Sequence, residues 1–119
     1  MLLAIFLMRM TEVELYIKIR KEGNAVVDPE GVSLLRAIAE TGSLITASAK
    51  VGISYNKAWK TVEAINRTAE KPLVEKLRGG NGGGGARITE YGYFILGEYG
   101  AIEKEVRLFT DKLNVEINI

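Results

Sequence analysis

The chain has no cysteine and no histidine among its 119 residues. The absence of cysteine excludes disulfides and thiolate chemistry. Without histidine, the commonest general base and most zinc sites are excluded as well. A metal site made only of carboxylates would still be open, but no paired-acid spacing suggests one. We therefore expect neither an enzyme nor a bound cofactor.

Long hydrophobic runs are also scarce. The apolar opening MLLAIFLM has only eight residues, and it lacks the basic start, the cleavage site and the length of a signal peptide or a membrane helix. Met8 and Met10 could each be the true start, so residues 1–12 are either an N-terminal extension or a mis-annotated start. A first strand or a partner contact is the other interpretation. We expect no membrane association and take the protein to be cytoplasmic.

The composition that remains is that of one globular domain, with 47% hydrophobic and 26% charged residues. The net charge of +1 hides an asymmetry. Residues 50–87 hold eight basic and three acidic side chains, whereas the rest of the chain holds eight basic and twelve acidic ones. A concentrated basic segment suggests a surface for a polyanion. The alternative is a solvated charged face.

The N-terminal part predicts a hairpin and then a helix. In residues 13–20, VELYIKIR, apolar and polar side chains alternate, as in a half-buried strand. Residues 22–24 are typical of a turn, and residues 25–27 of a short returning strand. Asp28 as N-cap and Pro29 at the first position then begin a helix that ends at Gly42.

Two more helices follow, joined by a short turn at Gly52 and Ile53. Ser43 should cap a helix over residues 44–51, which is rich in small side chains, and Ser54 should cap a helix that runs to about residue 70. This pattern predicts a helix-turn-helix, although such a pair is often only a helical hairpin.

The third helix has two chemically different faces. Its core stripe recurs at spacings of four, three and four: Ala58, Val62, Ile65 and Ala69. The opposite face has donors, acceptors and cations but no acid: Asn56, Lys57, Lys60, Thr61, Ala64 and Arg67. Such a face suits base edges and phosphates in the DNA major groove. Trp59 and Tyr55 lie on the flank of this helix. Trp59 is expected to lie mostly in the core, whereas for Tyr55 a contact with a phosphate is as much expected as a place in the core.

Six of the thirteen glycines lie in RGGNGGGGARIT, residues 78–89. A phosphate loop is disfavoured because no GK[ST] follows the glycines and no helix starts directly there. A linker is disfavoured because the chain is too short for two domains. Residues 73–77 and 86–88 are typical of short strands, so the run is predicted to be the tip of a hairpin, the wing of a winged helix.

The wing carries three predicted DNA contacts. Arg78 and Arg87 flank its loop and can reach phosphates or a narrow minor groove. Asn81 can adopt the positive φ that a turn requires.

Thr89 should cap a final helix that runs to about residue 113. Its apolar residues recur at spacings of four and three, as in a coiled-coil seam: Ile95, Tyr99, Ile102, Val106, Phe109 and Leu113. Part of this seam packs on its own domain, but the helix extends beyond what one small winged helix can cover. We therefore favour a homodimer contact. The predicted domain covers residues 13–113, with a tail at residues 114–119.

The run TGSLITASAKVGISYNKAWKTVEAIN, followed by LVEKLRGGNGGGGARITEYG, resembles the N-terminal DNA-binding domain of the ModE family of molybdate-responsive transcriptional regulators. GISYNKAW and GGGGARITEYG are specific in combination. A looser similarity to LysR-type regulators lies in TGSLITAS and in the serine that opens the third helix. The resemblance covers about residues 13–109.

The resemblance implies an α+β winged helix-turn-helix with an N-terminal β-hairpin and a long C-terminal dimerisation helix. It also implies a homodimer on an inverted-repeat operator in double-stranded DNA, with contacts from residues 54–57, Lys60 and the wing. The complete set of predicted DNA-binding residues is Ser43, Ser54, Tyr55, Asn56, Lys57, Lys60, Thr61, Arg78, Asn81 and Arg87.

Full-length members of that family continue into C-terminal oxyanion-binding domains, whereas this chain ends at Ile119. We therefore expect no oxyanion effector to bind this chain. The alternative function is a winged-helix module that binds a partner protein instead of DNA.

Overall fold

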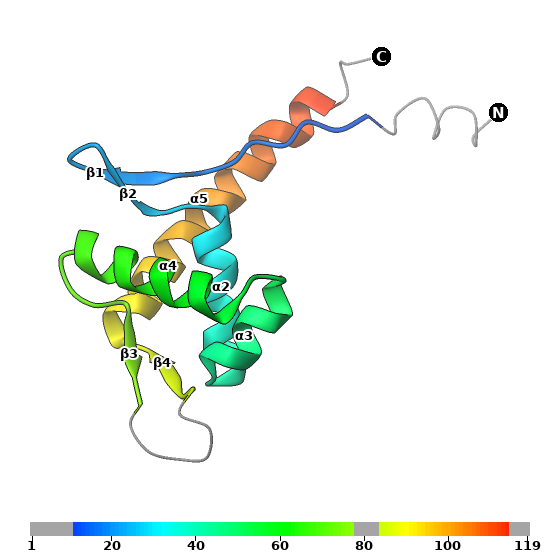
Figure 1. Cartoon of the computed structure of the whole chain (residues 1–119). Coiled ribbons are helices and arrows are strands. Elements are labelled where there is room, and N and C mark those ends of the chain that lie inside the picture. The colour runs from blue at the N-terminus through cyan, green and yellow to red at the C-terminus, as the bar shows by residue number, and fades with distance from the viewer. Residues whose placement is uncertain (1–10, 78–83, 115–119) are drawn as a thin grey trace. The chain divides into compact units, whose positions relative to one another are not determined.

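The structure is a computed structural model, and it describes residues 11–77 and 84–114. Its backbone contacts divide the chain into two units. One is Ile17–Gly97, and the other combines Met1–Tyr16 with Glu98–Ile119. The first unit contains three helices, two hairpins and the beginning of a fourth helix (Figure 1).

Three helices form the centre of the first unit: α2 (Pro29–Thr41), α3 (Leu44–Val51) and α4 (Tyr55–Thr68). Each begins at the cap that the sequence predicts, where a side-chain oxygen accepts a backbone N–H three residues on. The three capping bonds are Gly31 to Asp28 at 2.7 Å, Thr46 to Ser43 at 3.1 Å and Lys57 to Ser54 at 3.1 Å.

Left-handed glycines end the first two of these helices. Gly42 caps α2 with φ 67° and Gly52 caps α3 with φ 79°, a conformation that costs glycine little because it has no Cβ. The turn at residues 52–53 then leads into the cap of α4. The predicted helix-turn-helix is therefore confirmed.

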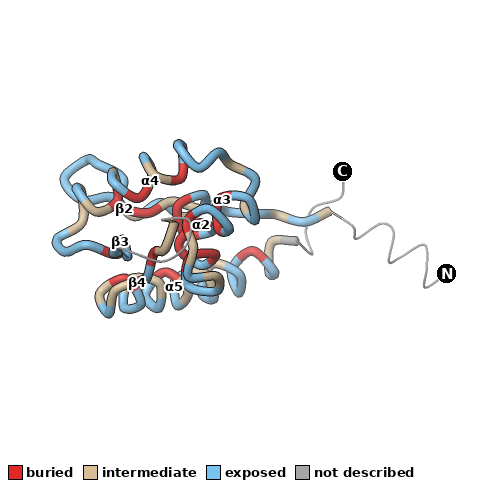
Figure 2. The backbone as a smooth tube through the Cα atoms, turned by 60° about the horizontal axis from the view of Figure 1, so that its bottom comes forward, coloured by how far each residue is buried: buried red, intermediate tan, exposed pale blue. Residues whose placement is uncertain are grey.

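The core lies where these helices meet, and Figure 2 shows the buried segments in red along them. From α2 the fully buried side chains are Leu34, Leu35, Ile38 and Val32. The predicted stripe on α4 is confirmed for Ala58, Val62 and Ile65, which are all buried. Ala69 instead adopts an extended conformation just after the helix, which ends at Thr68, slightly before the predicted end.

The first hairpin pairs β1 (Ile19–Lys21) with β2 (Asn24–Val27) in antiparallel fashion, with a register shift after Ile19. Its turn places Glu22 at φ 51° and Gly23 at φ 83°. The predicted strand over residues 13–20 was wrong in extent. Because Pro29 already begins α2, β2 has only four residues, and β1 correspondingly begins at Ile19 rather than at Val13.

The second hairpin is the predicted wing, and its strands are β3 (Val74–Lys76) and β4 (Ala86–Ile88). The hairpin also pairs with the segment between α2 and α3. There Leu44 N–H donates to the Gly84 carbonyl at 2.7 Å, and Ala86 N–H donates to the Gly42 carbonyl at 3.2 Å. The wing is thereby attached to the helix-turn-helix.

The last helix, α5 (Glu90–Asn114), begins in the first unit and continues into the second. Thr89 caps it as predicted, since its hydroxyl oxygen accepts the Gly92 N–H at 2.9 Å. The same hydroxyl donates to the Pro72 carbonyl at 2.7 Å, which ties the start of α5 to the segment before β3. No helix in the described ranges is both long and apolar enough to cross a membrane.

Candidate nucleic-acid interface

The outer face of α4 is exposed and polar. Four of its predicted contact residues are exposed: Tyr55, Asn56, Lys57 and Lys60. Thr61 is half-buried, and its hydroxyl donates to the Lys57 carbonyl at 2.9 Å. Because buried Ala58, Val62 and Ile65 fix the opposite stripe in the core, these polar side chains must point away from it.

Lys57 has a partner that the sequence did not indicate. Its Nζ lies 3.1 Å from Oε1 of Glu30, which belongs to the first turn of α2. The first turn of α4 itself contains no acid, and a cation near a helix N-terminus is disfavoured by the helix dipole. The carboxylate from α2 therefore balances the charge at the start of α4.

The two predicted contact serines both serve as helix caps. Ser43 accepts the Thr46 N–H and Ser54 accepts the Lys57 N–H. A hydroxyl that accepts a hydrogen bond still has its own proton to donate. Each serine can thus hold its helix and offer one donor to a ligand.

Asn66 joins α4 to the wing, and sequence reasoning missed it. Its Oδ1 accepts from the N–H groups of Leu73 at 2.9 Å and Val74 at 3.2 Å, while its Nδ2 donates to the Val74 carbonyl at 2.9 Å. One signal could have identified it: Asn66 follows core residue Val62 by four positions, which places a polar side chain beside the buried stripe.

A second contact links α4 to the wing. Lys76 Nζ lies 3.2 Å from the centroid of the Trp59 ring, within the range of a cation–π interaction. Trp59 is half-buried, so its predicted place in the core is only partly right. Together, the Asn66 and Lys76 contacts fix β3 against α4.

On the wing itself, Arg87 lies directly opposite Glu75 in the strand pairing. Its Nε and Nη2 both donate to Glu75 Oε2, at 3.2 and 2.8 Å. The Arg87 side chain is exposed. The other two wing predictions, Arg78 and Asn81, lie outside the described residues.

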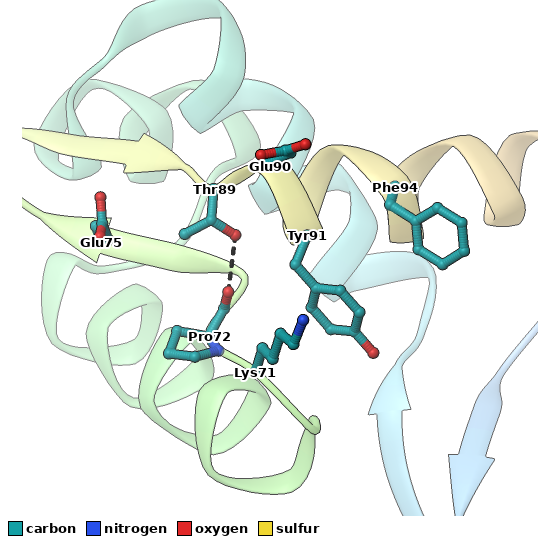
Figure 3. Close-up of a pocket in the computed structure, with 7 residues that line it drawn as sticks. All are labelled: Lys71, Pro72, Glu75, Thr89, Glu90, Tyr91 and Phe94. Carbon is teal, nitrogen blue, oxygen red and sulfur yellow. Dashed lines mark hydrogen bonds between the residues drawn. The ribbon is translucent and has the colours of Figure 1, made fainter.

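An open groove lies at the base of the wing, beside the start of α5 (Figure 3). Its lining residues are Lys71, Pro72, Glu75, Thr89, Glu90, Tyr91 and Phe94. Lys71 Nζ lies 5.7 Å from the centroid of the Tyr91 ring, and that ring stacks on Phe94 at 6.1 Å. Among the described residues, none of the predicted DNA-binding set lines this groove, which is therefore distinct from the outer face of α4.

The predicted dimer seam on α5 is not uniform. Ile95, in the first unit, is half-buried, as are Val106 and Leu113 in the second. Tyr99 is 3% exposed, whereas Ile102 is 40% and Phe109 is 56% exposed. Of the seam residues, Ile102 and Phe109 therefore offer the most surface to a partner.

Three helices followed by a hairpin that is fixed to the third of them define a winged helix-turn-helix protein. A crystal structure of a LysR family transcriptional regulator has a similar fold. It aligns with a TM-score of 0.55 over 70% of this chain and 27% of that chain, at 12% sequence identity. The predicted fold class, an α+β winged helix with an N-terminal hairpin and a long C-terminal helix, is confirmed.

Sequence similarity is closer to another group. The chain is 38% identical to the molybdenum transport protein ModE of Azotobacter vinelandii over 81% of its own length and 35% of the relative's. It is 36% identical to the DNA-binding transcriptional dual regulator ModE of Escherichia coli, over 74% of this chain and 34% of that protein. For the transcriptional regulator ModE of Haemophilus influenzae the identity is 36%, over 82% and 37%.

These matches show that the chain is homologous in sequence to part of the ModE proteins, and the resemblance found in its sequence is confirmed. It spans about a third of the length of the curated relatives that it matches. No protein-family model matches the sequence.

Proposed function

We propose that this protein is a sequence-specific regulator of transcription that binds double-stranded DNA through its winged helix. The observation that carries the proposal is the exposed outer face of α4, where Asn56, Lys57 and Lys60 lie together. Next to this face, Asn66 fixes the wing by three hydrogen bonds. The names of the ModE relatives, which include a DNA-binding transcriptional regulator, point the same way.

In this proposal α4 enters the major groove. Asn56 suits the edge of an adenine, and Lys57 and Lys60 suit a guanine or a phosphate. Arg87 and the wing loop approach the backbone or the minor groove. The chain acts in the cytoplasm, as a binding protein rather than an enzyme, through the domain over residues 13–113.

The experiment begins with selection of a preferred operator from random duplexes. Lys57→Ala and Lys60→Ala are then compared with Lys104→Ala, which removes an exposed lysine of α5. Each α4 variant should lose ~1–3 kcal/mol of operator binding if its lysine pairs a guanine. A lysine that meets a phosphate should instead weaken binding to all sequences equally. Unchanged binding in both α4 variants, with the circular dichroism spectrum intact, would contradict the proposed interface.

The alternative function is a module that binds a partner protein. Salt dependence separates the two functions, because nucleic-acid binding releases counterions and weakens steeply as salt rises. Wild-type protein that fails to bind random duplex DNA even at low salt would favour the alternative.

We also propose a homodimer on an inverted-repeat operator, with recognition helices about 34–36 Å apart, one turn of DNA. Ile102, which is 40% exposed, lies in the middle of the predicted seam. Ile102→Glu would bury an uncompensated charge against the partner and should yield monomers by light scattering. Leu108→Glu is the matched control, because Leu108 is an exposed apolar side chain of α5 outside the seam. A wild-type monomer, or a dimer that survives Ile102→Glu, would contradict this seam.

A further inference from the structure

Two of the predicted DNA-contacting cations are each held by an acid in the free protein. Lys57 on α4 pairs with Glu30 of α2, and Arg87 on β4 pairs with Glu75 of β3. We propose that Glu30 and Glu75 take the place of DNA phosphates in the free protein and release Lys57 and Arg87 when DNA binds. This inference rests on the proposed function.

The position of Glu30 supports such an exchange. Its carboxylate comes from another helix to the first turn of α4, where Lys57 faces the unfavourable end of the helix dipole. Phosphates bind well at helix N-termini because backbone N–H groups and the dipole both favour an anion there. Glu30 thus supplies, within the protein, the charge that an arriving phosphate would supply.

The pair is also weak enough to exchange. The side chains of Lys57 and Glu30 are 57% and 51% exposed, so water reaches both. Ion pairs of this kind contribute little to stability, because solvent screens them and two flexible side chains must be ordered. Lys57 can therefore change partners without unfolding the surrounding helices.

The wing repeats the arrangement with a different geometry. Glu75 and Arg87 are cross-strand neighbours, and two guanidinium nitrogens share one carboxylate oxygen. Both side chains are more than half exposed, at 52% and 63%. The guanidinium is a planar fork that can hold a phosphate as readily as a carboxylate. An acid therefore pairs with one predicted DNA-contacting cation on α4, Lys57, and with one on the wing, Arg87.

Lys60 provides an internal comparison. Within the described part of the chain it forms no ion pair, although it is exposed on the same helix as Lys57. A phosphate can reach Lys60 without displacing a carboxylate. Glu30 should consequently affect DNA binding through Lys57 and not through Lys60.

The direct test measures binding of random-sequence duplex DNA at low salt. Glu30→Gln and Glu75→Gln remove the competing charge but keep the size of the side chain. Each should bind DNA about two- to fivefold more tightly than wild type, the range expected for an exposed ion pair. Glu40→Gln is the matched control, because it removes the same charge and breaks the ion pair with Lys50, which is outside the predicted DNA-binding set.

A double-mutant cycle then tests whether Glu30 acts through its partner. The gain from Glu30→Gln should disappear in a Lys57→Ala background and persist in a Lys60→Ala background. A gain that persists without Lys57, or an equal gain from Glu40→Gln, would show general charge repulsion and overturn the proposal.

The remaining outcomes separate this inference from the proposed function. If wild-type protein binds DNA and both glutamine variants bind equally or less tightly, the exchange is refuted and DNA binding stands. If neither wild type nor Glu30→Gln binds any duplex, with intact circular dichroism spectra, the proposed function fails and the exchange fails with it.

Discussion

The two hairpins of the first unit are similar in size but are held in different ways. In β1–β2, a two-residue turn with positive φ at Glu22 and Gly23 joins the strands directly. In β3–β4, nine residues separate Lys76 from Ala86, and the strands keep a regular register. The first hairpin is thus closed at its turn, whereas the second is fixed by contacts with neighbouring elements.

The wing is held from three directions. Asn66 holds Leu73 and Val74 from α4, the segment at Gly42 and Leu44 pairs with Ala86 and Gly84 at the loop end of β4, and Thr89 ties the start of α5 to Pro72. Contacts with neighbouring elements therefore set the position of the wing strands. The comparison shows that β1–β2 is constrained by the geometry of its own turn, whereas β3–β4 is constrained from outside the hairpin.

The largest expected effect concerns Gly92, where α5 meets the base of the wing. A Cβ at this position would collide with the Leu73 carbonyl oxygen and lie 2.7 Å from Ile88 Cγ2. Because one of these neighbours is backbone, Gly92→Ala should lower the free energy of unfolding by about 2–3 kcal/mol. Urea denaturation measures the loss.

Gly97 is the matched control for that change. It lies in the same helix, and a Cβ there would meet no atom of the described residues within 4 Å outside its own helical backbone. Gly97→Ala should leave stability unchanged or raise it by up to about 1 kcal/mol. Equal losses for the two variants would mean that the close approach at Gly92 does not hold the wing.

A smaller effect is expected at Asn66. Asn66→Ala leaves the N–H groups of Leu73 and Val74 without their acceptor, which should cost about 2 kcal/mol of stability. Hydrogen exchange should show the loss of protection in β3 and β4 rather than in β1 and β2. Asn56→Ala, an exposed change on the same helix, should be close to neutral. Protection lost equally from both hairpins would argue against independent anchoring.

The smallest effect is expected at the turn of the first hairpin. Gly23 has φ 83°, so Gly23→Ala should cost about 1 kcal/mol and weaken protection in β1–β2 only. Gly23→Asn should cost less, because asparagine tolerates the left-handed region. If the alanine variant were as stable as wild type, the turn would not be what closes this hairpin.

Local features of this fold could be predicted from sequence. The caps at Asp28, Ser43, Ser54 and Thr89 and the left-handed end of α2 at Gly42 depend on residues a few positions apart. All of these were correctly predicted. The strand over residues 13–20 was overextended for a physical reason. Period-two alternation indicates which face of a strand is buried, but it does not say whether a partner strand is long enough to pair.

The contacts between distant segments could not be predicted in this way. Lys57 and Glu30 are 27 positions apart, and Trp59 and Lys76 are 17 apart. Composition correctly indicated where the cations concentrate, but only the packing of α2 beside α4 shows which acid faces which of them. The DNA-binding residues themselves stay predictions, to be tested by the lysine variants.

The contact between Lys76 and Trp59 has one further consequence. Trp59 is the only tryptophan in the chain, and a positive charge 3.2 Å from its ring centroid perturbs the excited state of the indole. Any displacement of β3 from α4 moves that charge and shifts the emission maximum of the Trp59 fluorescence. The intrinsic fluorescence of Trp59 therefore reports on the contact between α4 and the wing, without an attached dye.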